Sequence, residues 1–271
     1  MFYRPYRIVS LLLSLTLAAT AAAADEMPDP KEIVEKMIAA AGGEAFANLG
    51  ILELEVTEEE IRNDGTQSDS SYTLFVDTSN LGNMRMELPG EVVIAVNQAG
   101  GWSTAANVLD DRPQTPAMAR VILNQSVFPL LLPYSLQMEG VWLHEVHETQ
   151  IDGRDLWVIV IPFAKGFFKN PVMASIWILA VAKDDYSLQS LEFAPAPDLQ
   201  DVSPVGVRYR ILKQKEIDGA TVAEQILATG INSQYQESGA NRVTKIASKV
   251  QPWDPTLFLS PAQLEALEED D

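Results

Sequence analysis

The residue types most typical of metal chemistry lie in the segment His144-Glu145-Val146-His147-Glu148, which holds both histidines of the chain. In the H-E-x-x-H motif of zinc enzymes, the two histidines share one face of a helix. Here they are one residue closer together, and Val141 and Leu143 favour a strand. Alternate strand positions would point His144 and His147 to opposite faces. We therefore predict two surface histidines and no metal site.

No other motif indicates catalysis. The sequence has no cysteine, which excludes disulfides, thiolate metal sites and a cysteine nucleophile. It also has no G-x-S-x-G elbow, P-loop or G-x-G-x-x-G. The acidic run Glu58–Glu60 is more typical of a solvated strand end than of a calcium site. Asp184-Asp185 is likewise more typical of a turn between two strands. We expect no enzyme and no cofactor.

Charge and the N-terminus restrict the partners and the compartment. The formal net charge of −19 at pH 7 repels phosphate backbones, so we expect no nucleic acid. Arg4 and Arg7, the apolar run Ile8–Leu17 and the small residues Ala18–Ala24 are typical of a cleavable secretory signal. We predict cleavage after Ala24 and a soluble mature protein in the periplasm, with no cysteine for a lipid anchor.

The mature chain is expected to form one domain, residues 25–262, followed by a disordered acidic tail, 263–271. A helix with a capping box is predicted to start at Asp29, Pro30 and Glu32. The pair Gly42-Gly43 predicts the end of that helix. Ser260 begins a second helix-start pattern close to the tail.

Most of the chain shows the period-2 alternation of strands. Clear cases run through Leu52–Val56, Met84–Leu88 and Val205–Ile211. Turn pairs such as Pro89-Gly90 and Asp218-Gly219 separate such segments, which is typical of hairpins. We predict a mainly β (α+β) protein with one large antiparallel sheet of about ten or eleven strands.

Two apolar stretches interrupt this pattern. A short helix is expected over 115–124, followed by the proline-broken run Val127–Tyr134. The second stretch, Phe163–Asn170, mixes aromatic and cationic residues and has two interpretations. One is an ordinary hairpin tip; the other is an exposed loop that touches a membrane or partner. The contact residues would be Phe163, Lys165, Phe167, Phe168 and Lys169.

The segments Leu156–Ile161 and Val172–Ala182 are almost continuously apolar. A sheet covered on both faces explains such runs. The alternative is a concave sheet around an apolar ligand cavity, which would need a lid when empty. The run Phe128–Tyr134 is then the candidate lid.

Several short motifs together resemble the LolA-like outer-membrane lipoprotein-sorting family, whose fold LolB shares. In chain order they are the leader, Gly42-Gly43-Glu44 before a strand at Ile51, Gly101-Trp102, Asp152-Gly153 before Trp157, Asp184–Leu188, Asp218-Gly219 and Pro255–Pro261. The resemblance implies an open β half-barrel covered by short helices. Its cavity would receive a lipid or the acyl chain of a lipoprotein, and an arginine would latch the lid; Arg85 is the candidate.

On this interpretation the protein is a periplasmic carrier or sensor. Lipoprotein sorting to the outer membrane is the more specific role that the resemblance implies. The expected ligand contacts are Trp102, Phe128, Leu131, Tyr134, Trp157, Trp177 and Tyr209. The alternative function is a cell-envelope interaction module with a filled core and no ligand.

Overall fold

The computed structural model of the protein describes residues 27–62, 64–151, 153–168, 177–193, 206–232 and 236–269. The predicted signal segment lies outside these ranges, as do Asp152, Lys169 and the first part of the apolar run 172–182. Within the described ranges, no helix is both long enough and apolar enough to cross a bilayer.

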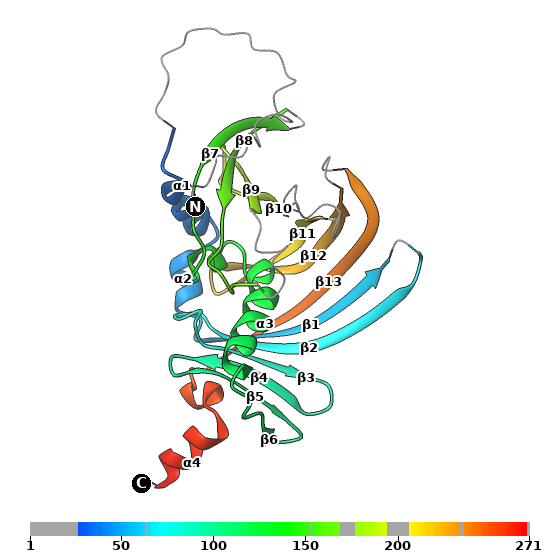
Figure 1. Ribbon diagram of the computed structural model, residues 1–271. Helices are drawn as coiled ribbons and strands as arrows, with labels where there is room; N and C mark the ends of the chain where they lie inside the picture. Colours follow the sequence, from blue (N-terminus) through cyan, green and yellow to red (C-terminus); the bar gives the residue numbers. More distant parts are fainter. Residues whose placement is uncertain are drawn as a thin grey trace, which may run out of the picture.

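The described residues form one antiparallel sheet of thirteen strands, in the order β6-β5-β4-β3-β2-β1-β13-β12-β11-β10-β9-β8-β7 (Figure 1). In chain order the strands are β1 Ile51–Ile61, β2 Gln67–Asp77, β3 Met84–Leu88, β4 Val92–Asn97, β5 Gly100–Ala105, β6 Val108–Leu109, β7 Val146–Ile151, β8 Arg154–Ile161, β9 Trp177–Ala182, β10 Leu188–Phe193, β11 Gly206–Ile217, β12 Ala220–Ile231 and β13 Glu237–Gln251. Two meanders, β1 to β6 and β7 to β13, meet where β1 pairs with β13.

Because β6 and β7 are the two edges, the sheet does not close into a barrel. This confirms the predicted mainly β class with a large open antiparallel sheet. The expected number of strands was too low, partly because β6 has only two residues and cannot show an alternating pattern.

The turn predictions hold where the chain is described. Asp218 and Gly219 connect β11 to β12 with φ of 48° and 88°. Such positive values at both central positions suit the right-handed twist of a hairpin. Gly90 and Glu91, between β3 and β4, also have positive φ. The Asp184-Asp185 pair lies between β9 and β10, as expected.

Alternation divides the sheet into two faces. On β1, Leu52, Leu54 and Val56 are buried on the side that we call the inner face. This face carries α1 (Pro30–Ala40), α2 (Gly43–Ala47) and α3 (Thr115–Leu130). The opposite, outer face carries the C-terminal 3-10 turn η4 (Pro255–Phe258), which packs on β3 and β4.

Helix α1 begins as predicted. The Asp29 carboxylate accepts a hydrogen bond from the Lys31 backbone N–H at 2.9 Å, and Pro30 occupies the first turn. Glu32 does not complete the expected capping box. Its carboxylate instead accepts a hydrogen bond from Lys36 Nζ at 2.7 Å. The buried stripe of the helix runs from Ile33 to Ile38 against the inner face.

Gly42 joins α1 to α2 in a position that requires glycine. Its φ is 83°, in the left-handed region. A Cβ atom built on Gly42 would lie 2.0 Å from the Gly219 carbonyl oxygen, in the β11–β12 turn. The end of the first helix is therefore pressed directly against a hairpin of the sheet.

Helix α3 is longer than the sequence predicts. It continues past Asn124 to Leu130, with Pro129 inside its last turn. Pro129 has no N–H and so removes one helical hydrogen bond, and the helix ends one residue later. The segment that we expected to be a proline-broken lid therefore begins as helix and continues through η2 (Tyr134–Gln137). Figure 1 shows α3 lying across the sheet.

The C-terminus corrects another expectation. Helix α4 spans Pro261–Glu269, so most of the segment expected to be a disordered tail is helical. Its start matches the predicted pattern, since the Ser260 backbone N–H donates to Gln263 Oε1 at 2.8 Å. In Figure 1 α4 extends away from the sheet.

Candidate functional site

The candidate site is a cavity of about 660 Å³ on the inner face, between α3 and strands β2 and β3. Met86 and Leu88 reach it because they alternate along β3, and Ile122 and Ser126 because they are one turn apart on α3. The lining residues are Thr57, Asp69, Ser70, Ser71, Tyr72, Met86, Leu88, Pro89, Ile122 and Ser126. Of these, Thr57, Asp69 and Ser71 hold outer-face positions on their strands, and most of the others come from the inner face and α3. Apolar side chains come from three elements, and polar ones are concentrated on β2.

The inner face changes from apolar to polar along β1. Val56, which pairs with Tyr72, is the last buried apolar residue of the row. Glu58 follows on the same face and pairs with Ser70 across the strands. The next inner position, Glu60, lies opposite Arg242 of β13. A molecule on this face would therefore meet apolar side chains at one end and charged ones at the other.

Glu58 is the centre of the polar end. Its carboxylate accepts hydrogen bonds from Tyr72 Oη at 3.2 Å and from Ser70 Oγ at 3.4 Å. It also lies 3.8 Å from Arg242 Nη1, with the Glu58 side chain only 19% exposed. Since Tyr72 and Ser70 line the cavity, this cluster connects the cavity wall with an arginine two strands away.

Burial and charge shift the ionisation of this cluster. Burial, assisted by the nearby carboxylate of Glu58, raises the pKa of the Tyr72 phenol well above its usual range. Burial also raises the pKa of Tyr209, which lies near Arg242. Both phenols therefore stay neutral and keep their O–H donors at any physiological pH.

Arg242 is the one member of this cluster with an unused buried donor. Its Nε–H is shielded from solvent and has no hydrogen-bond acceptor in the described residues. Burial alone would lower the pKa of Arg242, but Tyr209 and Glu58 outweigh it and raise the pKa. The guanidinium is therefore a permanent cation on the inner face.

The structure brings together three of the predicted ligand contacts. Phe128 and Trp177 meet edge to face at a centroid distance of 5.8 Å, and Trp177 stacks on Tyr209 at 5.8 Å. Phe193 also stacks on Trp177, at 5.6 Å. This aromatic cluster joins the end of α3 to strands β9 to β11. It fills the interior there instead of enclosing space.

The loop expected to present exposed aromatics completes this cluster. Phe163, Phe167 and Phe168 are at most 6% exposed and surround Phe128. The expectation of an exposed aromatic loop is therefore wrong, because these rings gain more by packing on α3 than by facing solvent. Lys165 is exposed, and Lys169 lies outside the described residues.

Three further predicted contacts have separate places on the inner face. Tyr134 stacks on Phe46, and its hydroxyl donates to the Thr221 carbonyl at 3.0 Å. Leu131, three residues earlier in the chain, is also buried. Trp157 is partly buried, with Lys183 Nζ 3.8 Å from its ring centroid.

Two predicted residues belong to the other face. Trp102 pairs with Ala95 on the outer side, and its Nε1 donates to the Phe258 carbonyl at 3.1 Å. Arg85 lies beside it and donates to the Leu257 carbonyl at 3.1 Å. Trp102 is therefore not brought together with the other predicted contacts. The suggestion that Arg85 latches the lid is wrong, because it holds the C-terminal turn.

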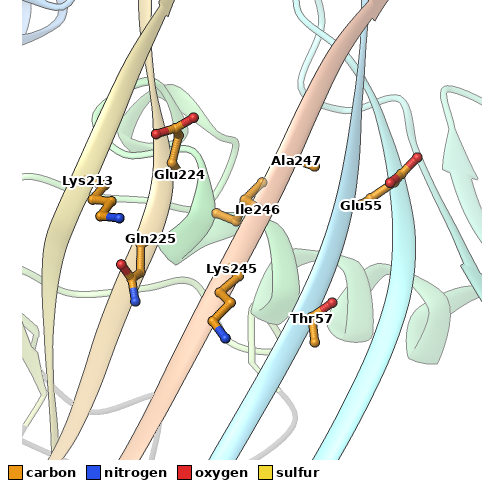
Figure 2. Close-up of a pocket in the computed structure, with 8 residues that line it drawn as sticks. All are labelled: Glu55, Thr57, Lys213, Glu224, Gln225, Lys245, Ile246 and Ala247. Carbon is orange, nitrogen blue, oxygen red and sulfur yellow. The ribbon is translucent and has the colours of Figure 1, made fainter.

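The outer face has a pocket of its own, of about 470 Å³. Figure 2 shows its residues on the strands, with helix α3 behind them. They are Glu55, Thr57, Lys213, Glu224, Gln225, Lys245, Ile246 and Ala247. Because two lysines and two glutamates take part, this pocket suits a polar ligand and not a hydrocarbon chain.

The histidine segment is exposed, as predicted. Both imidazoles approach the Glu145 carboxylate, His144 at 3.5 Å and His147 at 3.4 Å. They converge, instead of facing opposite sides, because β7 begins only at Val146. Among the described residues, no group of three or more histidine or carboxylate side chains is placed to hold a metal ion.

Sequence reasoning missed the cavity residues and the Glu58–Arg242 pair. The alternation of Met86 and Leu88 indicated a strand but not what the strand would face. The acidic run divides by alternation: Glu58 turns inward, whereas Glu59 turns outward and pairs with Lys245. Continuing the alternation of Leu52, Leu54 and Val56 into the run could have found Glu58.

No family model matches the sequence, and no curated protein matches it. Solved structures do match the fold. A LolA superfamily protein from Nitrosomonas europaea has a TM-score of 0.57 at 12% identity, covering 87% of this chain and 100% of that chain. A DUF1329 family protein from Desulfovibrio piger has a TM-score of 0.53 at 12% identity, covering 88% of this chain and 100% of that chain.

A third match is a domain assigned as an outer membrane lipoprotein-sorting protein, from Vibrio parahaemolyticus. Its TM-score is 0.50 at 11% identity, and the match covers 90% of this chain and 100% of that chain. The protein therefore has a LolA-like fold, as its motifs predict. At these identities the likeness concerns the fold alone.

Proposed function

We propose that this LolA-like protein binds the hydrocarbon chain of a lipid or lipoprotein in the inner cavity, as a carrier or sensor in the periplasm. The observation that carries the proposal is the 660 Å³ cavity between α3 and strands β2 and β3. Its apolar lining offers a chain about 0.8 kcal/mol for each CH₂ group removed from water. A few buried methylenes would therefore give useful affinity.

The lining suits a flexible ligand. Met86 is unbranched and adapts to irregular shapes, and Ile122 adds an apolar side chain from α3. The predicted leader would deliver the chain to the periplasm. Sorting of lipoproteins to the outer membrane is the more specific form of the proposal, supported by the fold shared with the Vibrio parahaemolyticus domain.

A second candidate has its own support. The cluster around Phe128 and Trp177 fills the interior over β9 to β11 with packed rings. A filled core is what an envelope interaction module without a ligand would need. The two functions differ in the use of the cavity that Ile122 and Ser126 of α3 line.

The test is mass spectrometry of organic extracts from the mature protein, purified without detergent from its native compartment. We expect bound lipid in the wild type and loss of that lipid in Ile122→Trp and Met86→Trp, which fill the cavity. Val108→Trp is the matched control, since Val108 is 70% exposed on β6. Circular dichroism would verify that each variant is folded.

The two functions predict different results. Lipid that is retained by Val108→Trp but lost from both cavity variants supports the carrier or sensor. If the folded wild type carries no lipid and also fails to bind an added fluorescent fatty acid, the proposal is wrong and the interaction module is favoured.

A further inference from the structure

The buried Nε–H of Arg242, on the inner face of the sheet, has no acceptor among the residues that the structure describes. Arg242 lies on β13, opposite Glu60 of β1 and Ala228 of β12. Folded proteins seldom leave a buried donor unpaired, because the group loses its water and gains nothing in return. Such a group indicates a missing partner.

The ion pair with Glu58 does not saturate this guanidinium. The Glu58 carboxylate approaches Nη1 at 3.8 Å, which is longer than a charge-assisted hydrogen bond. Nε and Nη2 form the other edge of the planar group. The Tyr209 phenol also interacts with this guanidinium, so Nε is the donor that remains open to an oxygen of a carboxylate or phosphate.

The position of the pair relates it to the cavity. Ser70 and Tyr72 line the cavity and donate hydrogen bonds to Glu58, which in turn lies beside Arg242. A ligand whose chain lies against Met86 and Ile122 would thus have its polar end near these strands. An apolar end and a charged end on one face match an amphiphile.

We infer that Arg242 binds the anionic oxygens of the headgroup of an amphiphile whose hydrocarbon chain occupies the inner cavity. The inference rests on the proposed function and adds to it the class of ligand: a chain that ends in a carboxylate or a phosphate. Glu58 is a positioning residue, which holds Arg242 through Nη1 and Tyr72 through its hydroxyl. A neutral headgroup leaves Nε unpaired and is bound more weakly.

The experiment is calorimetric titration of the mature protein with three amphiphiles that share one saturated chain. They are the alkyl phosphate, the fatty acid and the neutral monoacylglycerol, each below its critical micelle concentration. The wild type should bind both anionic amphiphiles at least about tenfold more tightly than the neutral one. Their order tells whether a phosphate or a carboxylate is the better ligand.

Two variants and a control separate recognition from folding. Arg242→Leu should abolish the preference for anionic headgroups while retaining affinity for the monoacylglycerol. Arg242→Lys should keep only part of the preference for anionic headgroups. Arg210→Leu removes an arginine from the outer side of β11, where Arg210 pairs with Glu237, and should keep the full preference.

The outcomes are distinguishable. If Arg242→Leu or the milder Arg242→Lys prefers anionic amphiphiles as strongly as the wild type, the inference is overturned, although the proposed function stands. If the wild type binds none of the three amphiphiles, the proposed function fails and the inference fails with it. A loss of preference confined to the Arg242 variants supports both.

Discussion

Trp102 donates a hydrogen bond from its indole Nε1 to the Phe258 carbonyl, 3.1 Å away, and so ties the middle of β5 to the C-terminal turn. The same carbonyl accepts from Asn97 Nδ2 at 2.9 Å, and Arg85 holds the preceding carbonyl. Three side chains of neighbouring strands thus bind the backbone of one turn. The segment after β13 is consequently a fixed part of the outer face.

Loss of Asn97 should weaken this clamp measurably. Asn97→Ala removes buried donors to Phe258 and Gln263 and leaves the Phe258 carbonyl with fewer partners. We expect a loss of about 1–3 kcal/mol in the free energy of unfolding, measured by urea denaturation. Gln150→Ala, which deletes an exposed amide on β7, is the control and should cost under about 0.5 kcal/mol. Equal losses would contradict the clamp.

The aromatic cluster should dominate the stability of the half formed by β8 to β11. Trp177 is 1% exposed, whereas Trp142 is 56% exposed. We expect Trp177→Ala to cost about 3–5 kcal/mol, because it leaves a cavity among packed rings. The same change at Trp142 should cost under about 0.5 kcal/mol. Guanidinium unfolding of both variants checks this, and a small effect at Trp177 would show that the rings do not pack as described.

Alkaline pH should weaken the hydrogen bonds that the Tyr134 hydroxyl donates to the carbonyls of Ala41, at the end of α1, and of Thr221 in β12. Burial raises the pKa of Tyr134 to about 12, above its ordinary value of 10.0. The folded state thus favours the neutral phenol, whose stabilisation is complete below pH 10 and is lost as the pH rises towards 12. Tyr134→Phe should be less stable at neutral pH and lose less stability over this interval. Unfolding curves across these pH values test it; parallel pH profiles for the two proteins would exclude the effect.

Two glycines with the same backbone conformation should respond differently to a methyl group. Gly42 and Gly90 both have a φ of 83°, so alanine at either position incurs the left-handed cost of about 1–2 kcal/mol. Only at Gly42 would the new Cβ meet another atom, the Gly219 oxygen at 2.0 Å. Thermal denaturation should therefore show a clearly larger loss for Gly42→Ala. Equal losses would mean that the helix and the hairpin can separate without cost.

Local patterns allowed much of the fold to be predicted. Alternation in Leu52–Val56 and the Asp218-Gly219 pair depend on neighbouring residues, so strands and hairpins could be read directly. The LolA-like motifs added the open arrangement of the sheet. Helix α3 was predicted too short because Pro129 was treated as a break, whereas the helix runs through Pro129 and ends one residue later.

The candidate site could not be predicted in the same way. Tyr72, Met86 and Ile122 come from three elements, and only the completed sheet shows that they line a common space. Trp102 and Trp177 are equally apolar, yet they lie on opposite faces because of strand register. Composition indicated an apolar excess but not the face on which it would be buried.

The pairing of β1 with β13 has a consequence for how the chain is made. Ile51 finds its partner in Gln251, so the sheet is complete only after almost the whole chain has been synthesised. Until then β1 has one open edge, and such long-range pairing is slow to form. A fragment that ends before Glu237 should therefore associate through this edge, which sedimentation would detect. During synthesis, the protein depends on its last strand to protect its first.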